Sequence, residues 1–269
     1  MNPFKVWLPE GSRVPLLLSV PHCGTQFPDD LIDQFNPNHI QDPDDTDWLV
    51  DRLYDFAPAM GITMITSTYS RWVIDLNRDP TNKPLYSDGR INTGLCPTTN
   101  FLGESLYLDN RQEVLQSEVE RRKEKYYQPY HQKLNDLLKD LKTEFGKVLL
   151  WDCHSIRQYV KTIYHENFQE LILGDADGVS ASPRTIEQVF NGLNSSGYSV
   201  SHNFPFKGGY ITRHYGKPLE NQQTLQLEMT KINYMDDSER QYDINRAEKM
   251  RSLLKSIFSS LLESIGKKE

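Results

Sequence analysis

Residues 14–24, VPLLLSVPHCG, and residues 147–155, KVLLWDCHS, decide how this chain folds. Each stretch holds an apolar run with the length of a buried strand. The first run leads through Pro21 into His22, and the second leads through Asp152 and Cys153 into His154. We therefore predict two buried strands, each followed at its carboxyl end by polar residues that include a histidine.

The rest of the chain alternates between strand and helix patterns. Further strands are predicted at 62–68, 72–76, 198–202 and 224–229. Helices are predicted at 47–60, at 111–145 with an interruption near Pro129 and an end at Gly146, at 183–193 and at 240–265. Residues 83–107 are rich in Gly, Pro, Thr and Asn and predict a long loop. This alternation predicts an α/β fold, with a mostly parallel or mixed sheet covered on both faces.

Composition narrows the class of protein. We expect one domain over residues 1–269, because the chain is long enough for a single large core and no linker divides it. No apolar stretch approaches the length of a membrane span and no signal peptide is recognisable, which predicts a cytoplasmic protein. The three cysteines form no CxxC pair, so neither a disulfide framework nor a thiolate zinc site is expected. A net charge of −7 argues against a nucleic-acid partner.

The two strand-end histidines predict a metal site. Parallel strands end at one edge of a sheet, so His22 and His154 should lie close together although they are far apart in sequence. Either histidine alone would more often be an ordinary core or surface residue. A catalytic zinc takes about three protein ligands, commonly His and Asp or Glu, and leaves one position open. We therefore predict one zinc ion per chain.

The third ligand should be a carboxylate from the acidic cluster that precedes the predicted helix at 47–60. One or two aspartates would be enough to cap that helix and to balance its dipole. Four stand within six positions, which is more than a cap needs, and either Asp45 or Asp47 could be the ligand. The cluster consists of Asp42, Asp44, Asp45 and Asp47.

Two other segments carry polar residues among apolar ones. Residues 70–78, SRWVIDLNR, contain arginines that could bind a carboxylate through two parallel hydrogen bonds, and an asparagine that could add another. Residues 225–229, LQLEM, place Glu228 inside an apolar strand. Burial raises the pKa of a glutamate, which suits a general base acting on water at a metal site.

Taken in order, six segments resemble the N-formylglutamate amidohydrolase family over about residues 16–236. Each segment is a weak signal alone, but their order along the chain is specific. They are SVPHCGTQFP (19–28), DTDWLVDRLYDF (45–56), YSRWVIDLNRDP (69–80), LWDCHSIR (150–157), FKGGYITRHYG (206–216) and LQLEM (225–229).

The resemblance implies a fold and a set of roles. The family is similar to zinc carboxypeptidases and aspartoacylases, which implies a three-layer αβα fold with a mixed, mostly parallel central sheet. By this resemblance His22 and His154 are metal ligands, Glu228 is the base and Arg71 polarises the scissile carbonyl. In the similar enzymes a glutamate stands three residues after the first histidine, where this chain has Thr25. The carboxylate ligand must then come from elsewhere, and Asp45 is the expected one.

The resemblance also implies a substrate. It is N-formyl-L-glutamate, hydrolysed to formate and L-glutamate in histidine degradation. One substrate carboxylate would be held by Asn77 with Arg78, and the other by Arg213 or Lys207. Two alternatives remain at this stage. One is a related hydrolase of another N-acyl amino acid or small peptide, and the other is a non-catalytic binding protein on the same fold. The oligomeric state cannot be read from the sequence.

Overall fold

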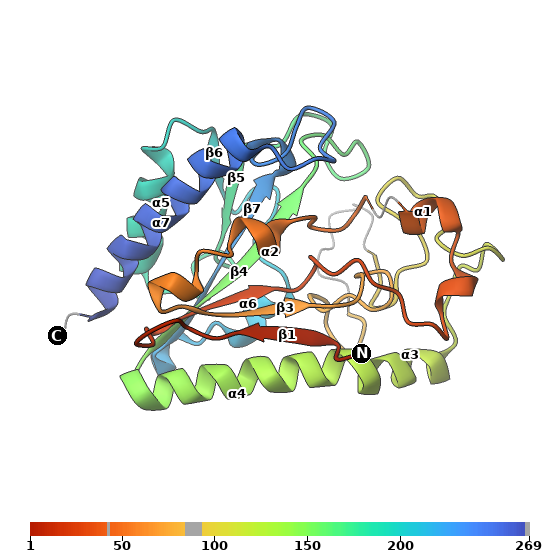
Figure 1. Ribbon diagram of the computed structural model, residues 1–269, viewed down its shortest axis with the longest axis horizontal. Coiled ribbons are helices and arrows are strands. Elements are labelled where there is room, and N and C mark those ends of the chain that lie inside the picture. Colours follow the sequence, from red (N-terminus) through yellow and green to blue (C-terminus); the bar gives the residue numbers. More distant parts are fainter. Residues whose placement is uncertain (42–43, 84–92, 267–269) are drawn as a thin grey trace.

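A seven-stranded sheet runs through the middle of the molecule (Figure 1), for which the computed structural model describes residues 1–41, 44–83 and 93–266. The spatial order of the strands is β1-β3-β2-β4-β7-β5-β6. Their bounds are β1 Phe4–Trp7, β2 Leu16–Val20, β3 Thr63–Ser67, β4 Val148–Ile156, β5 Leu171–Gly174, β6 Val200–His202 and β7 Gln222–Thr230.

Four of the six strand pairings are parallel, so the predicted mixed, mostly parallel sheet is confirmed. The pairs β2/β3, β2/β4, β4/β7 and β5/β6 are parallel. The pairs β1/β3 and β5/β7 are antiparallel. The sequence analysis did not predict β1 or β5. The three strands β2, β4 and β7 all end at the same edge, where the polar residues gather.

Helices cover both faces of the sheet, which confirms the three-layer αβα arrangement (Figure 1). One apolar core lies between the sheet and α2, α5 and α7, and the other lies between the sheet and α3, α4 and α6. The α-helices are α1 Pro37–Gln41, α2 Val50–Leu53, α3 Gln116–Arg122, α4 Gln128–Phe145, α5 Pro183–Asn194, α6 Tyr210–Tyr215 and α7 Ile244–Gly266. Short 3₁₀ turns are η1 Ile32–Gln34, η2 Pro58–Met60, η4 Pro218–Glu220 and η5 Lys231–Asn233.

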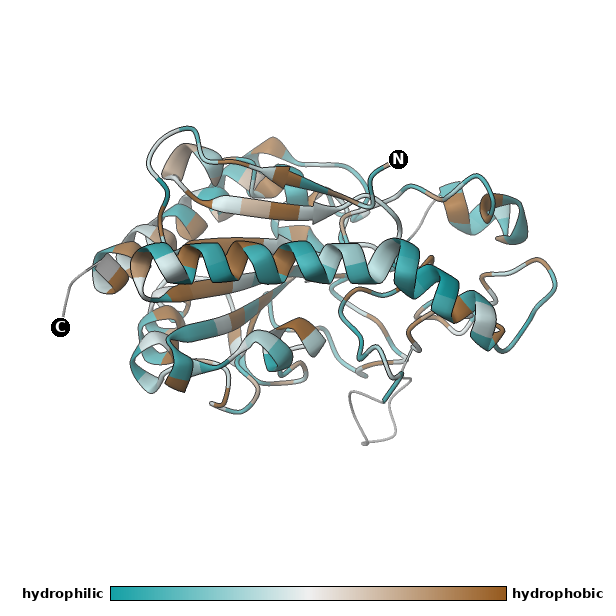
Figure 2. Cartoon of the chain, turned by 90° about the horizontal axis from the view of Figure 1, so that it is seen from below, coloured by the Kyte–Doolittle hydropathy of each residue, from teal (hydrophilic) through white to brown (hydrophobic). Residues whose placement is uncertain are grey.

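The helix predicted at 111–145 is a continuous but bent rod. A π-helical segment, η3 Lys123–Tyr127, joins α3 to α4 just before Pro129. The wider π-helical turn and the bend accommodate Pro129, which cannot donate an amide hydrogen bond to the preceding turn. Figure 2 shows the rod lying across the sheet, with its shorter α3 end bent away from the line of α4. The predicted interruption is thus a local widening of the helix and not a break.

Two predicted elements are wrong. The helix predicted at 47–60 is reduced to α2 and the turn η2, and it cannot begin before Val50 because Leu49 has φ 60°, a left-handed conformation. The strand predicted at Trp72–Leu76 is a chain of turns. The Val73 amide bonds back to the Ser70 carbonyl at 2.9 Å, and the Asp75 side chain accepts the Asn77 amide at 2.9 Å. A short apolar run can be buried without pairing in a sheet.

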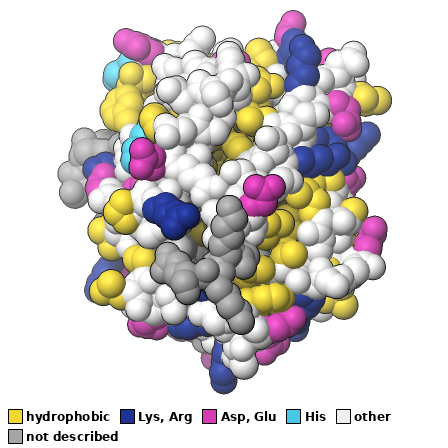
Figure 3. Space-filling model, turned by 90° about the vertical axis from the view of Figure 1, so that its left-hand side faces the viewer, with side chains coloured by type: hydrophobic (Ala, Val, Ile, Leu, Met, Phe, Trp, Pro, Cys, Tyr) yellow, Lys and Arg dark blue, Asp and Glu magenta, His cyan; other side chains and the backbone are white. Residues whose placement is uncertain are grey.

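The distribution of charged side chains on the visible surface agrees with the composition of the chain. On the side shown in Figure 3, positively and negatively charged side chains are interspersed and form no field of one sign. None of the helices in the described part of the chain is long and apolar enough to cross a membrane. The loop predicted at 83–107 falls partly on residues 84–92, which lie outside the described residues.

Gly146 should be a measurable contributor to stability. It ends α4 with φ 75°, and nothing lies within 4 Å of the position that a Cβ would take. Gly146→Ala should therefore lower the free energy of unfolding by about 1 kcal/mol through backbone strain alone. Gly11→Ala is the matched control, because its Cβ also meets open space and its φ is not positive. Equal stability of the two variants in urea denaturation would contradict the assignment.

Candidate active site

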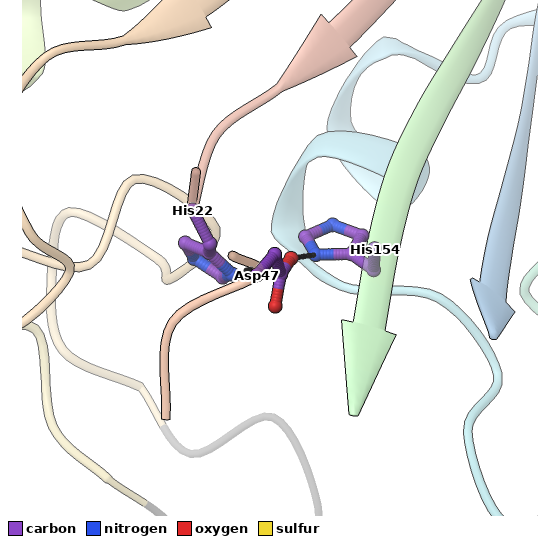
Figure 4. Close-up of side chains that lie close together, drawn as sticks. All are labelled: His22, Asp47 and His154. Atoms are coloured by element: carbon purple, nitrogen blue, oxygen red, sulfur yellow. Dashed lines mark hydrogen bonds and ion pairs between the residues drawn. The ribbon is translucent and has the colours of Figure 1, made fainter. Parts of the chain in front are cut away.

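His22, Asp47 and His154 form a buried group at the carboxyl edge of the sheet (Figure 4). His22 stands two residues after the end of β2, and His154 lies inside β4, which pairs with β2. The two imidazole ring centroids are 4.9 Å apart. Asp47 comes from the loop before α2, and its amide donates a 3.0 Å hydrogen bond to the His22 carbonyl. The sheet sets the distance between the histidines, and this backbone bond holds Asp47 between them.

Both histidines face the same carboxylate oxygen with the same ring nitrogen. Asp47 Oδ2 lies 2.9 Å from His154 Nδ1 and 3.7 Å from His22 Nδ1. The three side chains are at most 5% exposed. A buried carboxylate with two imidazole nitrogens is a donor set typical of catalytic zinc, and the ligand atoms lie within 4.8 Å of one another. This group could therefore hold a metal ion.

The opposite ring nitrogens are held by other side chains. His22 Nε2 lies 2.7 Å from Asp75 Oδ1. His154 Nε2 lies 2.8 Å from Asn77 Nδ2 and 3.2 Å from Asp152 Oδ2. The Asp75 and Asp152 carboxylates can each accept the hydrogen of the Nε2 atom that they face, which is the tautomer that leaves Nδ1 free for a metal, whereas Asn77 Nδ2 is itself a donor and cannot accept it. The Nδ1 atoms are thereby left to face Asp47.

The protonation of His154 and that of Asp47 depend on each other. Burial opposes a charged imidazole, but Asp152 and Asp47 hold the pKa of His154 well above its usual value. Burial also opposes an ionised Asp47, yet the hydrogen bond from His154 and the two nearby histidines lower its pKa. Asp152 Oδ1 is buried and has no hydrogen-bond partner among the described residues. A divalent cation in this group would take the place of the imidazole hydrogen as the positive partner of these carboxylates.

Asp75 and Asp152 are supporting residues that the sequence analysis missed. The Asp75 carboxylate binds His22 through Oδ1 and Arg71 Nη2 through Oδ2, the latter at 2.5 Å. Burial opposes its ionisation, but Arg71, Arg78 and His22 hold its pKa well below the usual range. Asp75 stands inside an apolar stretch, which is the same signal that singled out Glu228 and could have identified it.

The structure revises the expected carboxylate ligand from Asp45 to Asp47. Asp45 Oδ2 accepts hydrogen bonds from Trp72 Nε1 at 3.2 Å and from the Phe101 amide at 2.9 Å. These bonds hold the Asp45 side chain away from the histidine pair and tie together the loops around it. Asp44 pairs with Arg157, and Asp42 lies outside the described residues. Asp47 is the member of the cluster that the backbone places between the histidines.

Glu228 lies directly beside His154. The two are Cα partners in the parallel pairing of β7 with β4, so their side chains share one face of the sheet. Burial raises the pKa of Glu228 to about 8. The carboxylate has no hydrogen-bond partner among the residues that the structure describes. A buried carboxyl group with a pKa near neutrality, next to a metal-binding group, is placed to accept and return a proton.

Arg71 lies in the same buried region. Its Nη1 lies 3.4 Å from the Asp45 carbonyl oxygen, in addition to the ion pair with Asp75. Its guanidinium also lies 4.9 Å from the centre of the Phe101 ring. Arg71 is 6% exposed. A fixed, buried guanidinium beside the group could stabilise negative charge that develops on a substrate oxygen.

The four expected substrate-binding residues have different surroundings. Asn77 is part of the site, but its amide is occupied by His154, Asp152 and the Ile211 amide, so it supports His154. Arg78 binds the carbonyl and hydroxyl oxygens of Thr93 and lies 3.7 Å from Asp75.

The other two residues lie farther toward the surface. Arg213 is exposed on α6 and donates to the Gly208 carbonyl at 3.0 Å. Lys207 is ion-paired with Asp177 at 2.9 Å, and both of these side chains are well exposed. Neither of these contacts joins Arg213 or Lys207 to the buried group.

The fold and the site define an α/β enzyme with a buried group, suited to a metal ion, at the carboxyl edge of its sheet. A family model described as N-formylglutamate amidohydrolase matches residues 14–235. The N-formylglutamate deformylase of Pseudomonas aeruginosa is 40% identical to this chain over 256 residues, covering 93% of each chain. That of Pseudomonas putida is 38% identical over 255 residues, again covering 93% of each.

A solved structure agrees with these sequence matches. The N-formylglutamate amidohydrolase of Ralstonia eutropha JMP134 superposes with a TM-score of 0.83 at 27% identity, covering 98% of this chain and 99% of that one. A gene product of Agrobacterium tumefaciens shares the fold, with a TM-score of 0.71 at 18% identity. The chain belongs to the N-formylglutamate amidohydrolase family. It is accordingly an enzyme, a hydrolase acting on an amide bond.

The choice between Asp47 and Asp45 can be tested by metal content. Asp47→Ala should weaken metal binding by at least about 100-fold, because supporting residues alone already contribute 10–100-fold. Asp45→Ala should keep its metal, since its carboxylate binds Trp72 and Phe101 instead. Elemental analysis of the two folded variants, purified alike, makes the comparison. Loss of metal from Asp45→Ala alone would show that the group is wrongly assigned.

Proposed function

We propose that this enzyme is a zinc-dependent hydrolase that converts N-formyl-L-glutamate and water to formate and L-glutamate. The substrate is supported by the family and by the names of the two Pseudomonas relatives. The single observation that carries the chemistry is the register of β4 and β7, which sets Glu228 beside the His22–Asp47–His154 group. We further propose that the enzyme acts in the cytoplasm, in histidine degradation.

The donor set fits zinc. His22 and His154 would bind it through Nδ1, and Asp47 through its carboxylate, while Asp75, Asn77 and Asp152 hold the two imidazoles in place. When bound, zinc lowers the pKa of a coordinated water molecule and polarises a carbonyl oxygen. The unpartnered Asp152 Oδ1 leaves buried negative charge close to His154, which favours a cation in the group.

Glu228 is the proposed general base and acid. Its carboxylate would accept a proton from the attacking water molecule and then deliver that proton to the leaving nitrogen of glutamate. Burial raises its pKa to about 8, which favours the protonated form that delivers a proton, and a cation bound in the neighbouring group would lower the pKa and favour the ionised form that accepts one. Its burial keeps bulk water from competing for the proton. The strand on which it stands fixes its distance from His154.

Arg71 is proposed to stabilise the oxygen of the formyl group as negative charge develops on it. Asp75 holds the guanidinium in one orientation, so little reorganisation accompanies the reaction. Arg78 is the proposed partner of the α-carboxylate. It lies beside Asp75, and Asn77 immediately before it supports His154. Of the expected substrate-binding pair, Arg78 would thus bind the substrate, whereas Asn77 would hold the metal ligand His154.

Substrate preference can be measured by formate release. N-formyl-L-glutamate should be hydrolysed faster than N-formyl-L-glutamine and N-formyl-L-methionine, because an acidic side chain gains from a cationic partner. N-acetyl-L-glutamate, assayed by release of glutamate, tests the acyl group. A chelator should abolish all of these activities. Faster hydrolysis of the neutral formyl amino acids would favour the alternative, a related N-acyl amino acid hydrolase.

The role of Glu228 is tested by Glu228→Gln, which keeps the shape but removes the proton acceptor. Turnover should fall by roughly 10²–10⁴-fold, with metal content and melting temperature unchanged. Glu220→Gln, an exposed glutamate just before β7, is the control and should retain full turnover. A Glu228→Gln protein with normal turnover but low stability would show that Glu228 has a structural role instead.

A further inference from the structure

Tyr234 lies between the two parts of the chain that carry Asp47 and His154. It directly follows η5, the short turn after β7, and its side chain is fully buried. Its hydroxyl oxygen lies 2.8 Å from the Trp48 carbonyl oxygen and 2.9 Å from the Ser155 hydroxyl oxygen. Trp48 is the residue after Asp47, and Ser155 is the residue after His154. The hydroxyl therefore contacts the direct chain neighbours of two members of the proposed metal group.

The direction of these two hydrogen bonds follows from their chemistry. A carbonyl oxygen only accepts, so the single hydrogen of the Tyr234 hydroxyl goes to Trp48, and the Ser155 hydroxyl donates to the Tyr234 oxygen. Burial raises the pKa of Tyr234 well above its usual value, so the hydroxyl keeps the hydrogen that it donates. These bonds, called here the Tyr234 bridge, connect β4 to the loop at 44–49 that carries Asp47.

The Tyr234 bridge complements the backbone contact already described for Asp47. The Asp47 amide bonds to the His22 carbonyl at 3.0 Å, which fixes Asp47 relative to the end of β2. The bridge fixes the next residue, Trp48, relative to β4 on the side of His154. Together the two connections set the distance of the Asp47 carboxylate from each imidazole. The 2.9 Å contact between Asp47 Oδ2 and His154 Nδ1 is therefore supported from outside the metal group.

The backbone at the bridged position is one that needs such support. Leu49, the residue after Trp48, has φ 60°, a left-handed conformation that a leucine rarely adopts. Such a conformation persists only where the surrounding structure fixes it, and the Trp48 carbonyl belongs to the peptide bond that precedes Leu49. Lys231, at the start of η5, holds the other end of the loop, since its Nζ donates to the Asp44 carbonyl at 2.7 Å. The segment after β7 thus holds the loop at both ends.

We propose that Tyr234 is a positioning residue, which holds the loop of Asp47 against β4 and so keeps Asp47 in place beside His154. The inference rests on the proposed function and deepens it, because the proposed zinc site is the site that Tyr234 would position. In this role Tyr234 acts through Trp48 and Ser155. Its effect should appear in the zinc affinity, because residues that orient metal ligands contribute about 10–100-fold to metal binding.

The test removes the hydroxyl and keeps the ring. In a competition titration of the metal-free protein against a zinc-binding dye, Tyr234→Phe should weaken zinc binding by about 10–100-fold. Tyr54→Phe is the matched control, because the Tyr54 hydroxyl belongs to an equally buried ring in the same core and accepts from Trp151 Nε1 at 3.2 Å. It should leave the zinc affinity unchanged, although it also removes a buried hydroxyl.

Two results of this titration would overturn the proposal. Equal zinc affinity of Tyr234→Phe and the wild type would mean that Asp47 keeps its position without the bridge. Equal weakening by Tyr234→Phe and Tyr54→Phe would mean that zinc binding follows the general stability of this core. If Tyr234→Phe does not fold, Ser155→Ala, which breaks the bridge at its other end, is measured in its place and is held to the same outcomes.

Hydrogen exchange separates this proposal from the proposed function, because it needs neither zinc nor turnover. In the metal-free protein the Asp47 amide is protected by its bond to the His22 carbonyl. Tyr234→Phe should speed exchange at that amide, relative to the amides of β4, by at least about 5-fold, the effect of one ordinary hydrogen bond on a local opening. Tyr54→Phe should not.

Faster exchange at Asp47 in Tyr234→Phe supports the positioning role even if the wild type binds no zinc and releases no formate, so that the proposed function is wrong. Equal exchange in Tyr234→Phe and the wild type overturns the positioning role, even if N-formyl-L-glutamate is hydrolysed.

Discussion

The contact between Asp47 and the two imidazoles is the interaction on which the candidate site depends. It requires β2 and β4 to be neighbours, because only then do His22 and His154 approach with ring centroids 4.9 Å apart. It also requires the loop before α2 to turn back, so that the Asp47 amide can bond to the His22 carbonyl. Burial then makes each partner expensive to leave unpaired, which gives the group one stable arrangement. The same burial leaves carboxylate charge that a metal ion would balance.

The pairing of strands in the sheet brings residues that are far apart in the sequence close together around this group. β7 pairs with β4 in a parallel register that sets Glu228 opposite His154, more than seventy positions away in the sequence. The turns from Ser70 to Asn77 bring Asp75 to His22 and Asn77 to His154. Each histidine is therefore fixed on one ring nitrogen and presented on the other. The proposed division between binding a metal, moving a proton and holding a substrate follows from these placements.

The sequence predicted those features that depend on local pattern. Apolar runs located β2, β3, β4 and β7, and a charged residue inside an apolar run located Glu228. It could not distinguish Asp45 from Asp47, because the two stand two positions apart before the same helix, and only the backbone bond to His22 separates their roles. The run at Trp72–Leu76 was misread since burial among turns and burial in a sheet leave the same apolar signature.

The central claim is that the Nδ1 atoms of His22 and His154, together with the Asp47 carboxylate, hold one zinc ion beside Glu228. Anomalous X-ray diffraction at the zinc absorption edge, on crystals of the protein purified without added metal, tests it most directly. The account predicts one strong peak per chain in contact with those three side chains. A peak bound through Asp45 or through the Nε2 atoms, or no peak even after zinc is supplied, would contradict it.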